Sequence, residues 1–554
     1  MIGSSNLLPR LPVGKRKKSM LRSSAAVTLS RFARETEGNM SILALAGSML
    51  MLVFGGVGID MMLAEVERTK IQNTLDGSAL AAANLEQRLD PYLVVEDHFD
   101  KMLLGDTLTS IDVNEGLNYR TVTVEAHRNF PANFLKLLNV DVLQAGGTSQ
   151  AEERIQNIEI SLILDISGSM GSNQKIENLR SSAKEFVTTV LNGQNSGLTT
   201  ISIVPYNATV NLGPRLAPHF TLTDEHEASS CVRMYDADFL QTGISPSSEL
   251  QRLAHFDPYS LDENSVQTTS SWCPTDDYGA ILPHSNDLDE LVAHIETLGA
   301  GGNTAIDLGM KWGVALLDPA ARPVVSGLIG DGHVVSEASG RPGAYDAIDV
   351  LKIAVVMTDG MNTTQYDLKP KYNGGDSDIW IDDRGDNDPY NDRFSHRVSN
   401  ASGTSNDVYY LERFKNGSSS DRYANEPDGG SNARRMSNAE VFQRWGTRAF
   451  GNKFFRKPYQ DGRVSYSEYY NAYYSYGSIV SGSQADARLS NICEKARDTG
   501  ITVFSIGFEA PEEGQAAMRN CASSPAHYFP VEGLEISDAF KAIARTINQL
   551  RLTQ

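Results

Sequence analysis

Two carboxylates and three hydroxyls stand in this sequence at a spacing typical of a divalent cation site. They are Asp165, Ser167, Ser169, Thr304 and Asp359. The first three form a D-x-S-x-S motif, the fourth follows the segment G-A-G-G-N, and the last lies in M-T-D-G. Carboxylate and hydroxyl oxygens are hard ligands, which suit Mg²⁺, Ca²⁺ or Mn²⁺. The spacing therefore predicts one binding site for such an ion, with Mg²⁺ as the first expectation.

The elements around these residues favour a common location. An apolar, β-rich run at 158–164 ends at Asp165, and a second run at 351–357 ends just before Asp359. Thr304 stands at the mouth of a predicted helix, residues 305–317. In a doubly wound fold, ligands bind beyond the carboxyl ends of the strands. We therefore expect three loops to bring the five side chains to one edge of a sheet.

The rest of the chain supports a doubly wound α/β fold. Further strands are predicted at 199–204, 209–212, 501–508 and 527–530, and further helices at 175–191, 287–298, 485–498, 514–520 and 536–552. Continuous apolar strands that alternate with amphipathic helices indicate a mostly parallel sheet covered on both faces. Two stretches, 214–283 and 362–484, interrupt this alternation. They are too long for structureless loops, so we interpret them as large insertions with some structure of their own.

These motifs resemble the von Willebrand factor A family, which has a Rossmann-like fold. The match consists of D-I-S-G-S at 165–169, N-T at 303–304 and T-D-G at 358–360, and the resemblance covers 155–552 apart from the insertions. It implies a metal-ion-dependent adhesion site, in which Asp165, Ser167, Ser169 and Thr304 bind the ion and Asp359 acts through water. An open coordination position would then accept an Asp or Glu of a partner protein.

A simpler interpretation of D-x-S-x-S remains open. Asp and Ser side chains also cap loops and helix starts by bonding to nearby backbone groups. In that case the motif only begins the helix predicted from Lys175. The three matching segments together favour the ion site over this alternative.

A membrane anchor is predicted near the N-terminus. Residues 42–59 carry no charge, and 40–62 are long enough to cross a hydrocarbon core of about 30 Å. Residues 1–39 carry a net charge of +6 in a chain of net charge −20, so the positive-inside rule puts them in the cytoplasm. A cleaved signal peptide, a buried core helix and processing after Gly38 are the alternatives. No A-x-A cleavage site directly follows the apolar run, which argues against the first of these.

The segment after the anchor predicts a small α+β stalk, residues 63–150. Residues 61–89 are typical of a helix that continues out of the membrane, 120–126 alternate like a strand, and 146–150 look like a linker. The sequences at 37–42 (E-G-N-M-S-I), 58–60 (G-I-D) and 68–83 resemble the TadE/TadG-like proteins of bacterial Flp pilus assembly. The resemblance implies a helical stalk that leads into an exported region, often with an A domain. A generic anchor with an Ala-rich helix is the alternative.

Four cysteines occur without C-x-x-C spacing, so a zinc site is not expected. An even number in an exported domain favours disulfides. Sequence proximity favours the pairs Cys231–Cys273 and Cys493–Cys521, although four cysteines allow three pairings. In a reducing compartment the same residues would be free thiols.

Two further segments carry open alternatives. Residues 382–392 (D-D-R-G-D-N-D-P-Y-N-D) favour a solvated acidic loop over a second calcium site, because they lack the spacing of an EF-hand loop. The tyrosines between 466 and 476 are compatible with a binding surface or with the local core of the insertion.

The sequence predicts a binding protein of the bacterial inner membrane. A net charge of −20 disfavours nucleic acid as a partner, and G-x-S-x-G, phosphate-loop and H-E-x-x-H motifs are missing, so we expect no enzyme. The expected function is metal-dependent capture of an acidic residue on a pilus assembly component or surface ligand, with a periplasmic or extracellular C-terminal domain. A pilus-associated scaffold, in which the ion only stabilises loops, is the alternative. A subunit of a cytoplasmic chelatase-type machine is a third.

Overall fold

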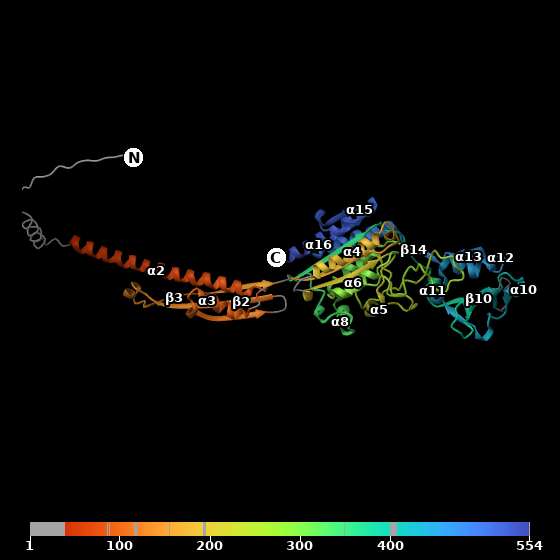
Figure 1. The fold of residues 1–554 in the computed structure, drawn as a ribbon, viewed down its shortest axis with the longest axis horizontal. Helices are drawn as coiled ribbons and strands as arrows, with labels where there is room; N and C mark the ends of the chain where they lie inside the picture. The colour runs from red at the N-terminus through yellow and green to blue at the C-terminus, as the bar shows by residue number, and fades with distance from the viewer. Residues whose placement is uncertain are drawn as a thin grey trace, which may run out of the picture. The chain divides into compact units, whose positions relative to one another are not determined.

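The computed structural model describes residues 39–552 except 86, 88, 116–118, 155, 192–195, 348 and 399–406 (Figure 1). The basic segment predicted to be cytoplasmic, 1–39, therefore lies outside the described residues apart from its last position. The chain divides after Arg154 into two compact units. Each unit has its own hydrophobic core.

The first unit consists of one long helix on a small antiparallel sheet. The helix is α2 (Asn39–Ala83), and the sheet order is β1-β2-β3. The other elements are β1 (Leu108–Glu115), β2 (Tyr119–Pro131), β3 (Val142–Arg154) and the helix α3 (Pro91–Lys101). Buried residues of the second half of α2, among them Ile71 and Leu75, pack against Val122 and Val124 of β2. This unit is the predicted α+β stalk, and α2 runs without a break through the predicted anchor.

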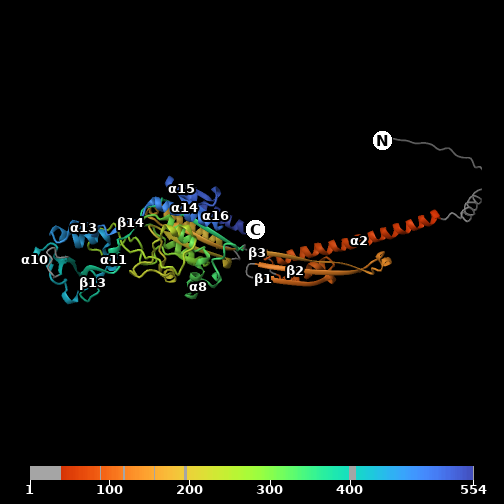
Figure 2. The same ribbon diagram turned by 180° about the vertical axis from the view of Figure 1, so that it is seen from behind.

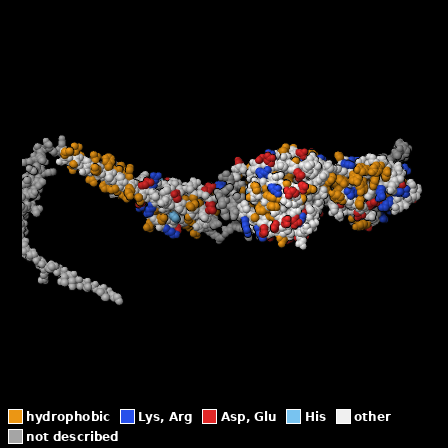
Figure 3. All heavy atoms as spheres, turned by 90° about the horizontal axis from the view of Figure 1, so that it is seen from above, with side chains coloured by type: hydrophobic (Ala, Val, Ile, Leu, Met, Phe, Trp, Pro, Cys, Tyr) orange, Lys and Arg blue, Asp and Glu red, His pale blue; other side chains and the backbone are white. Residues whose placement is uncertain are grey.

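The first half of α2 leaves its apolar side chains uncovered. Met40, Leu52 and Phe54 are exposed, and Figure 3 shows hydrophobic side chains along this part of the helix. Among the described residues, α2 is the one helix long and apolar enough to cross a membrane, by length and composition. The structure thus agrees with one membrane-crossing helix at 40–62.

The segment 146–150 is not a linker. It lies in the middle of β3, where Gly146 pairs with His127 and Gly147 with Ala126 of β2. The sequence A-G-G-T-S-Q lacks apolar alternation, so its strand character comes from pairing with β2. A Cβ on Gly147 would lie 2.6 Å from Gln72 Oε1 of α2, so the helix crosses this strand close to the glycine.

The second unit is built on a six-stranded sheet in the order β16-β15-β7-β4-β5-β6. Its strands are β4 (Asn157–Asp165), β5 (Thr199–Tyr206), β6 (Leu282–Ser285), β7 (Val350–Thr358), β15 (Thr502–Phe508) and β16 (Tyr528–Val531). Neighbouring strands are parallel except β5 and β6, which are antiparallel. In chain order the strands therefore lie 3-2-1-4-5-6, the doubly wound arrangement. This confirms the predicted fold class.

Helices cover both faces of this sheet (Figures 1 and 2). One face carries α4 (Lys175–Leu191), α6 (Leu288–Thr297) and α16 (Glu535–Leu552). The other carries α7 (Ile306–Ala315), α8 (Arg322–Gly330), α14 (Gly482–Asp498) and α15 (Glu512–Cys521). Because side chains alternate along a strand, the central strands contribute buried side chains to the hydrophobic cores on both faces of the sheet.

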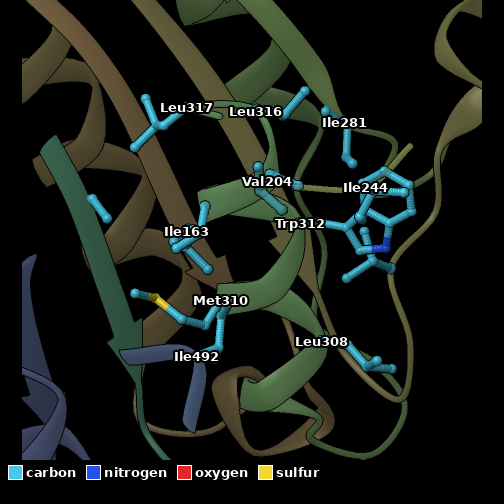
Figure 4. Packing of buried hydrophobic residues seen from close by; sticks show 14 of the residues in the cluster. Ile163, Val204, Ile244, Ile281, Leu308, Met310, Trp312, Leu316, Leu317 and Ile492 are labelled. Atoms are coloured by element: carbon cyan, nitrogen blue, oxygen red, sulfur yellow. The ribbon is translucent and has the colours of Figure 1, made fainter. Parts of the chain in front are cut away.

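The core under α7 brings this helix close to the sheet. Figure 4 shows Met310 and Trp312 of α7 packed with Ile163 and Val204 of the central strands. A Cβ on Gly313 would lie 2.3 Å from Ile163 Cδ1, so a glycine is required at this closest approach. The close packing holds the start of α7 at the edge where β4 and β7 end.

The third strand of the sheet is not the one predicted. Residues 209–212 form only an isolated bridge, Asn211 with Ala280, and the edge position is taken by β6. The sequence of β6, L-P-H-S, contains a proline and no apolar alternation, so it carried no strand signal. A proline is tolerated there because β6 is an edge strand.

The insertion at 362–484 supplies most of an aromatic core, whose fully buried members include Phe442, Trp445 and Phe454. Phe256 and Trp272 of the first insertion pack into the same core. The sheet of the 362–484 insertion has the order β12-β11-β10-β9-β13, and its main helices are α11 and α13. The bounds are β8 (Gln365–Leu368), β9 (Asp376–Asp382), β10 (Arg393–Val398), β11 (Val408–Leu411), β12 (Tyr423–Ala424), β13 (Arg434–Ser437), α11 (Asn438–Phe450), α13 (Tyr466–Tyr473) and β14 (Tyr476–Val480). The short strand β8 pairs with β14 and closes the insertion at its base.

The tyrosines between 466 and 476 belong in part to the aromatic core. Tyr469 of α13 and Tyr476 of β14 pack against it, whereas Tyr466 and Tyr470 are exposed. They form a continuous series of ring contacts on the helix surface.

Both disulfides pair as sequence proximity favoured. Cys231 is joined to Cys273 inside the first insertion, and Cys493 of α14 is joined to Cys521 at the end of α15. All four sulfur-bearing side chains are buried. The first bridge closes an insertion with little regular structure, and the second ties two helices on one face of the sheet.

Candidate metal centre

Three loops meet at the carboxyl edge of the central strands. Asp165 is the last residue of β4, and Asp359 follows β7, which pairs with β4 in parallel register up to Leu164 and Met357. Thr304 lies two residues before the first residue of α7, Ile306. The five predicted side chains are thus brought to one edge, as the strand order requires.

The oxygens of three of these side chains touch one another. Ser167 Oγ lies 3.1 Å from Ser169 Oγ, and Ser169 Oγ donates a hydrogen bond of 2.6 Å to Asp359 Oδ1. In an octahedral Mg²⁺ site with bonds near 2.1 Å, neighbouring ligand oxygens are about 3 Å apart. The observed spacing therefore fits a small divalent cation.

Thr304 approaches this group across Gly360. A Cβ built on Gly360 would lie 3.4 Å from Thr304 Oγ1 and 4.0 Å from Ser169 Oγ. The hydroxyls from two separate loops thus flank the same point. Because residue 360 is a glycine, the hydroxyls of Thr304 and Ser169 face the same space.

Asp165 lies beneath the site and is fully buried. Its Oδ1 accepts a 2.8 Å hydrogen bond from the backbone N–H of Ser167, and its Oδ2 accepts one of 2.7 Å from Thr358 Oγ1. Burial, together with the nearby charge of Asp359, raises the pKa of Asp165 to about 6. A bound cation would offset both effects, so the donor set fits a metal. Because Asp165 is fully buried and hydrogen-bonded, replacing it would also disturb the fold.

Two glycines bring the loops together. The N–H of Gly168 donates to Gly302 O, and the N–H of Gly301 donates to Ile166 O, both at 2.9 Å. Gly168 does not have a left-handed backbone, so a tight turn is not the reason for a glycine. A Cβ there would lie 3.1 Å from Gly302 O, so its role is to allow the D-x-S-x-S loop to approach the loop before Thr304.

The serines do not act as helix caps. The 3-10 turn at Gly168–Gly171 has Ser167 at its start and no side-chain cap, and Ser169 Oγ bonds across to Asp359. The serine contacts favour a shared site, while Asp165 also caps its own loop by accepting the N–H of Ser167, as the local alternative expected.

Three residues that the sequence did not single out complete the site: Thr358, Lys175 and Glu509. Lys175 places its Nζ 3.1 Å from Asp359 Oδ2 and 3.5 Å from Glu509 Oε2. Thr358 was visible in T-D-G. Lys175 and Glu509 carried no signal, because the pairs Lys175–Asp359 and Lys175–Glu509 each join residues far apart in the sequence.

The metal edge is partly open to solvent. Ser169 is exposed, and so is Met361 just after Gly360. The first insertion flanks the edge, since Tyr259 is half exposed and its hydroxyl lies 3.5 Å from Asn303 Oδ1. A partner would therefore meet the ion site beside side chains supplied by an insertion.

The acidic segment 382–392 joins β9 to β10. Asp383, Asp386 and Asp388 each accept a hydrogen bond from a backbone N–H two residues further on. Within the described residues, no three His, Cys, Asp or Glu side chains are grouped as a metal site. Such contacts are typical of a loop whose own Asp side chains cap its backbone N–H groups.

The sheet order, with its antiparallel third strand, and the three motif segments at its carboxyl edge define a unit of the von Willebrand factor A type. Residues 38–85 match a family model described as putative Flp pilus-assembly TadE/G-like. The match confirms the resemblance seen in the anchor and the Ala-rich helix. A comparison with curated proteins gives no match.

Several solved structures are similar to the chain. One is the vWF domain of the type V pili tip protein Mfa5 from Porphyromonas gingivalis, with 16% identity and a TM-score of 0.30 over 71% of this chain and 96% of that chain. The adhesive tip pilin GBS104 from Group B Streptococcus agalactiae has 13% identity and a TM-score of 0.31 over 70% and 99%. The pilus adhesin RrgA from Streptococcus pneumoniae has 11% and 0.29 over 79% and 49%. At such values the fold assignment depends on this chain's own sheet topology.

Proposed function

We propose that the chain is a membrane-anchored binding protein that captures a protein partner through a divalent cation, without catalysis. The setting we propose is bacterial Flp/Tad pilus assembly or surface adhesion. The chain would cross the inner membrane once, with its N-terminus in the cytoplasm and its second unit outside. The TadE/G-like match at 38–85 and the apolar, uncovered half of α2 support this setting.

The observation that carries the proposal is the meeting of oxygens from three loops around one point. Asp165, Ser167, Ser169 and Thr304 would hold the ion directly, and Asp359 through water. When bound, Mg²⁺ supplies an electrophilic position that a carboxylate of the partner can fill. Because three of the five donors are neutral hydroxyls, little of the ion's charge is cancelled by the protein.

Two contacts favour binding over mere loop stabilisation. Ser169 and Lys175 each bond to Asp359, so the protein's own side chains join the D-x-S-x-S loop and the start of α4 to the loop after β7. A purely structural ion would duplicate these links. The scaffold alternative therefore predicts that removing metal lowers the melting temperature and leaves partner capture unchanged.

Calorimetric titration of the full chain in detergent with Mg²⁺, Ca²⁺ and Mn²⁺ tests the site. Ser169→Ala removes an exposed hydroxyl, and we expect at least ~10-fold weaker binding of the preferred ion. Ser172→Ala is the matched control, because Ser172 is also exposed and its side chain makes no described hydrogen bond. Equal binding by wild type and Ser169→Ala contradicts the site.

Capture of the partner is tested separately. Wild type and Ser169→Ala are used as baits on cell-surface and envelope fractions, first in Mg²⁺ and then in chelator. We expect a partner that wild type retains in Mg²⁺. The same partner should be lost from wild type in chelator and from Ser169→Ala in Mg²⁺. Retention in chelator would favour the scaffold.

A further inference from the structure

The turn between β2 and β3 exposes an apolar surface close to the membrane helix. This hairpin tip comprises residues 132–142, between Pro131 at the end of β2 and the start of β3. Its exposed apolar side chains are Phe134, Leu137, Leu138, Val140 and Val142. Leu137 is 70% exposed, so the sheet and α2 leave it without cover. Apolar side chains grouped at one turn indicate an interaction surface.

The hairpin tip contacts α2 inside its apolar run. A Cβ built on Gly56 would lie 2.4 Å from the ring of Phe134, so the ring rests on the helix backbone at this glycine. Gly56 belongs to the uncharged segment 42–59. The tip therefore reaches the part of α2 that is proposed to lie in the membrane.

Asp60 fixes the hairpin tip in this position. Its carboxylate is buried and accepts hydrogen bonds from the backbone N–H groups of Asn133, Phe134 and Leu135, at 3.2, 2.7 and 2.7 Å. Unpaired backbone donors are costly in hydrocarbon, so such a turn needs these partners near a bilayer. This role also explains why an acid directly follows the apolar run.

The hairpin tip touches α2 about one helical turn before Asp60. Gly56 precedes Asp60 by four residues, which corresponds to about 6 Å along a helix. Beyond Asp60 the helix still exposes Met61, Met62 and Val66, so its apolar surface does not end at Asp60. Interfacial elements bury apolar faces about 5–10 Å into the boundary between headgroups and acyl chains. The hairpin tip lies at that level.

The charges of the hairpin tip also suit a lipid surface. Lys136 is exposed at the turn, and the one acid between 132 and 142 is Asp141. A lysine can extend its amine to lipid phosphates while its methylene groups stay in apolar surroundings. A lone exposed lysine among leucines is typical of residues at a membrane interface.

We infer that the hairpin tip is a second membrane contact, which inserts Leu137 and Leu138 into the leaflet bordering the first unit. The inference depends on the proposed crossing by α2, and is independent of the metal centre and of the direction of crossing. Two contacts with the bilayer would stop the first unit from rotating freely about the axis of α2. A single helix cannot provide that constraint.

A site-specific probe tests the inference. All four native cysteines form disulfides, so a single new thiol can be labelled selectively. The full chain with Leu137→Cys carries an environment-sensitive fluorophore in nanodiscs that hold one chain each, which excludes a second copy and any partner. Asn114→Cys is the control: Asn114 is exposed on β1 and pairs with Thr121, ten residues before Pro131 and thus roughly 34 Å along the strand.

The expected result is a blue-shifted emission at position 137, quenched by lipid-bound nitroxides and several-fold less by iodide than at position 114. Adding Leu138→Asp should reverse much of the shift, because a charge opposes insertion. A chain that enters nanodiscs but shows equal iodide quenching at both positions overturns this inference alone. A chain that fails to enter nanodiscs overturns the anchor, and the inference with it.

Discussion

At the scale of single residues, Lys175 balances the charge of the candidate metal centre. Its ammonium lies 3.1 Å from Asp359 Oδ2, and both side chains are nearly buried. Loss of one partner of a buried ion pair leaves the other charge uncompensated, which costs about 3–5 kcal/mol. In the presence of a divalent cation the same lysine repels the ion.

We therefore expect Lys175→Met to cost less stability with metal than without it. In chelator, the free energy of unfolding should fall by about 3 kcal/mol. In saturating Mg²⁺ the loss should be smaller, and Mg²⁺ should raise the melting temperature more in the variant than in wild type. Thermal unfolding with and without Mg²⁺ measures the loss of stability and the rise in melting temperature caused by the ion. Equal shifts in the two proteins would contradict a cation at this site.

Asp307 on α7 makes stability depend on pH. It is fully buried and accepts hydrogen bonds from Gln365 Nε2 at 2.9 and 3.1 Å. Burial raises its pKa from 3.8 to about 7, in spite of the hydrogen bonds from Gln365 and the nearby charge of Arg488. Between these two values the folded state keeps a proton that the unfolded state has lost. The free energy of unfolding must therefore decrease as pH rises from about 4 to about 7.

Asp307→Asn should remove this dependence. An amide keeps the shape and stays neutral, so the variant should be more stable than wild type at neutral pH, by up to about 4 kcal/mol. Near pH 4 the two proteins should differ little. Urea unfolding across this range measures the difference. Parallel pH profiles for the two proteins would show that Asp307 is not the titrating group.

At the scale of elements, the fit of α7 on the sheet determines where Thr304 lies. Gly313→Ala would raise the helix propensity of α7 by about 1 kcal/mol. The added methyl group would, however, lie 2.3 Å from the buried Ile163 Cδ1, and overpacking of a core costs about 1–3 kcal/mol. We expect net destabilisation, seen as a lower melting temperature.

Gly330→Ala provides the control for this substitution. Gly330 ends α8, is exposed, and has no atom within 4 Å of a built Cβ. This variant should be neutral or slightly more stable. Equal effects of the two substitutions would mean that the α7 contact is looser than the structure indicates.

At the scale of the whole molecule, function depends on which side of the membrane each part occupies. The proposed topology predicts that protease added to spheroplasts digests the second unit, while a tag at the N-terminus survives until the membrane is opened. Immunoblots of the two ends measure this. Protection of the C-terminal end would exclude partner capture outside the cell and favour a cytoplasmic role.

Local features of the sequence were sufficient to predict much of this protein. Apolar runs identified the central strands, because strands buried on both faces need side chains of that kind. The D-x-S-x-S, N-T and T-D-G segments predicted five donors, and the structure places them at one edge, although ion binding stays a prediction. The two disulfide pairs also followed from short sequence separations.

Only the tertiary structure revealed the features that depend on distant partners. The strand character of β3 comes from pairing with β2, and β6 is a strand because an edge position tolerates its proline. Lys175 reaches Asp359 across 184 residues, and Glu509 reaches Lys175 across 334. The hairpin tip meets Gly56 and Asp60 over more than 70 residues. Sequence patterns report local periodicity and residue type, whereas pairing, ion pairs and exposed surfaces are decided by which segments the fold brings together.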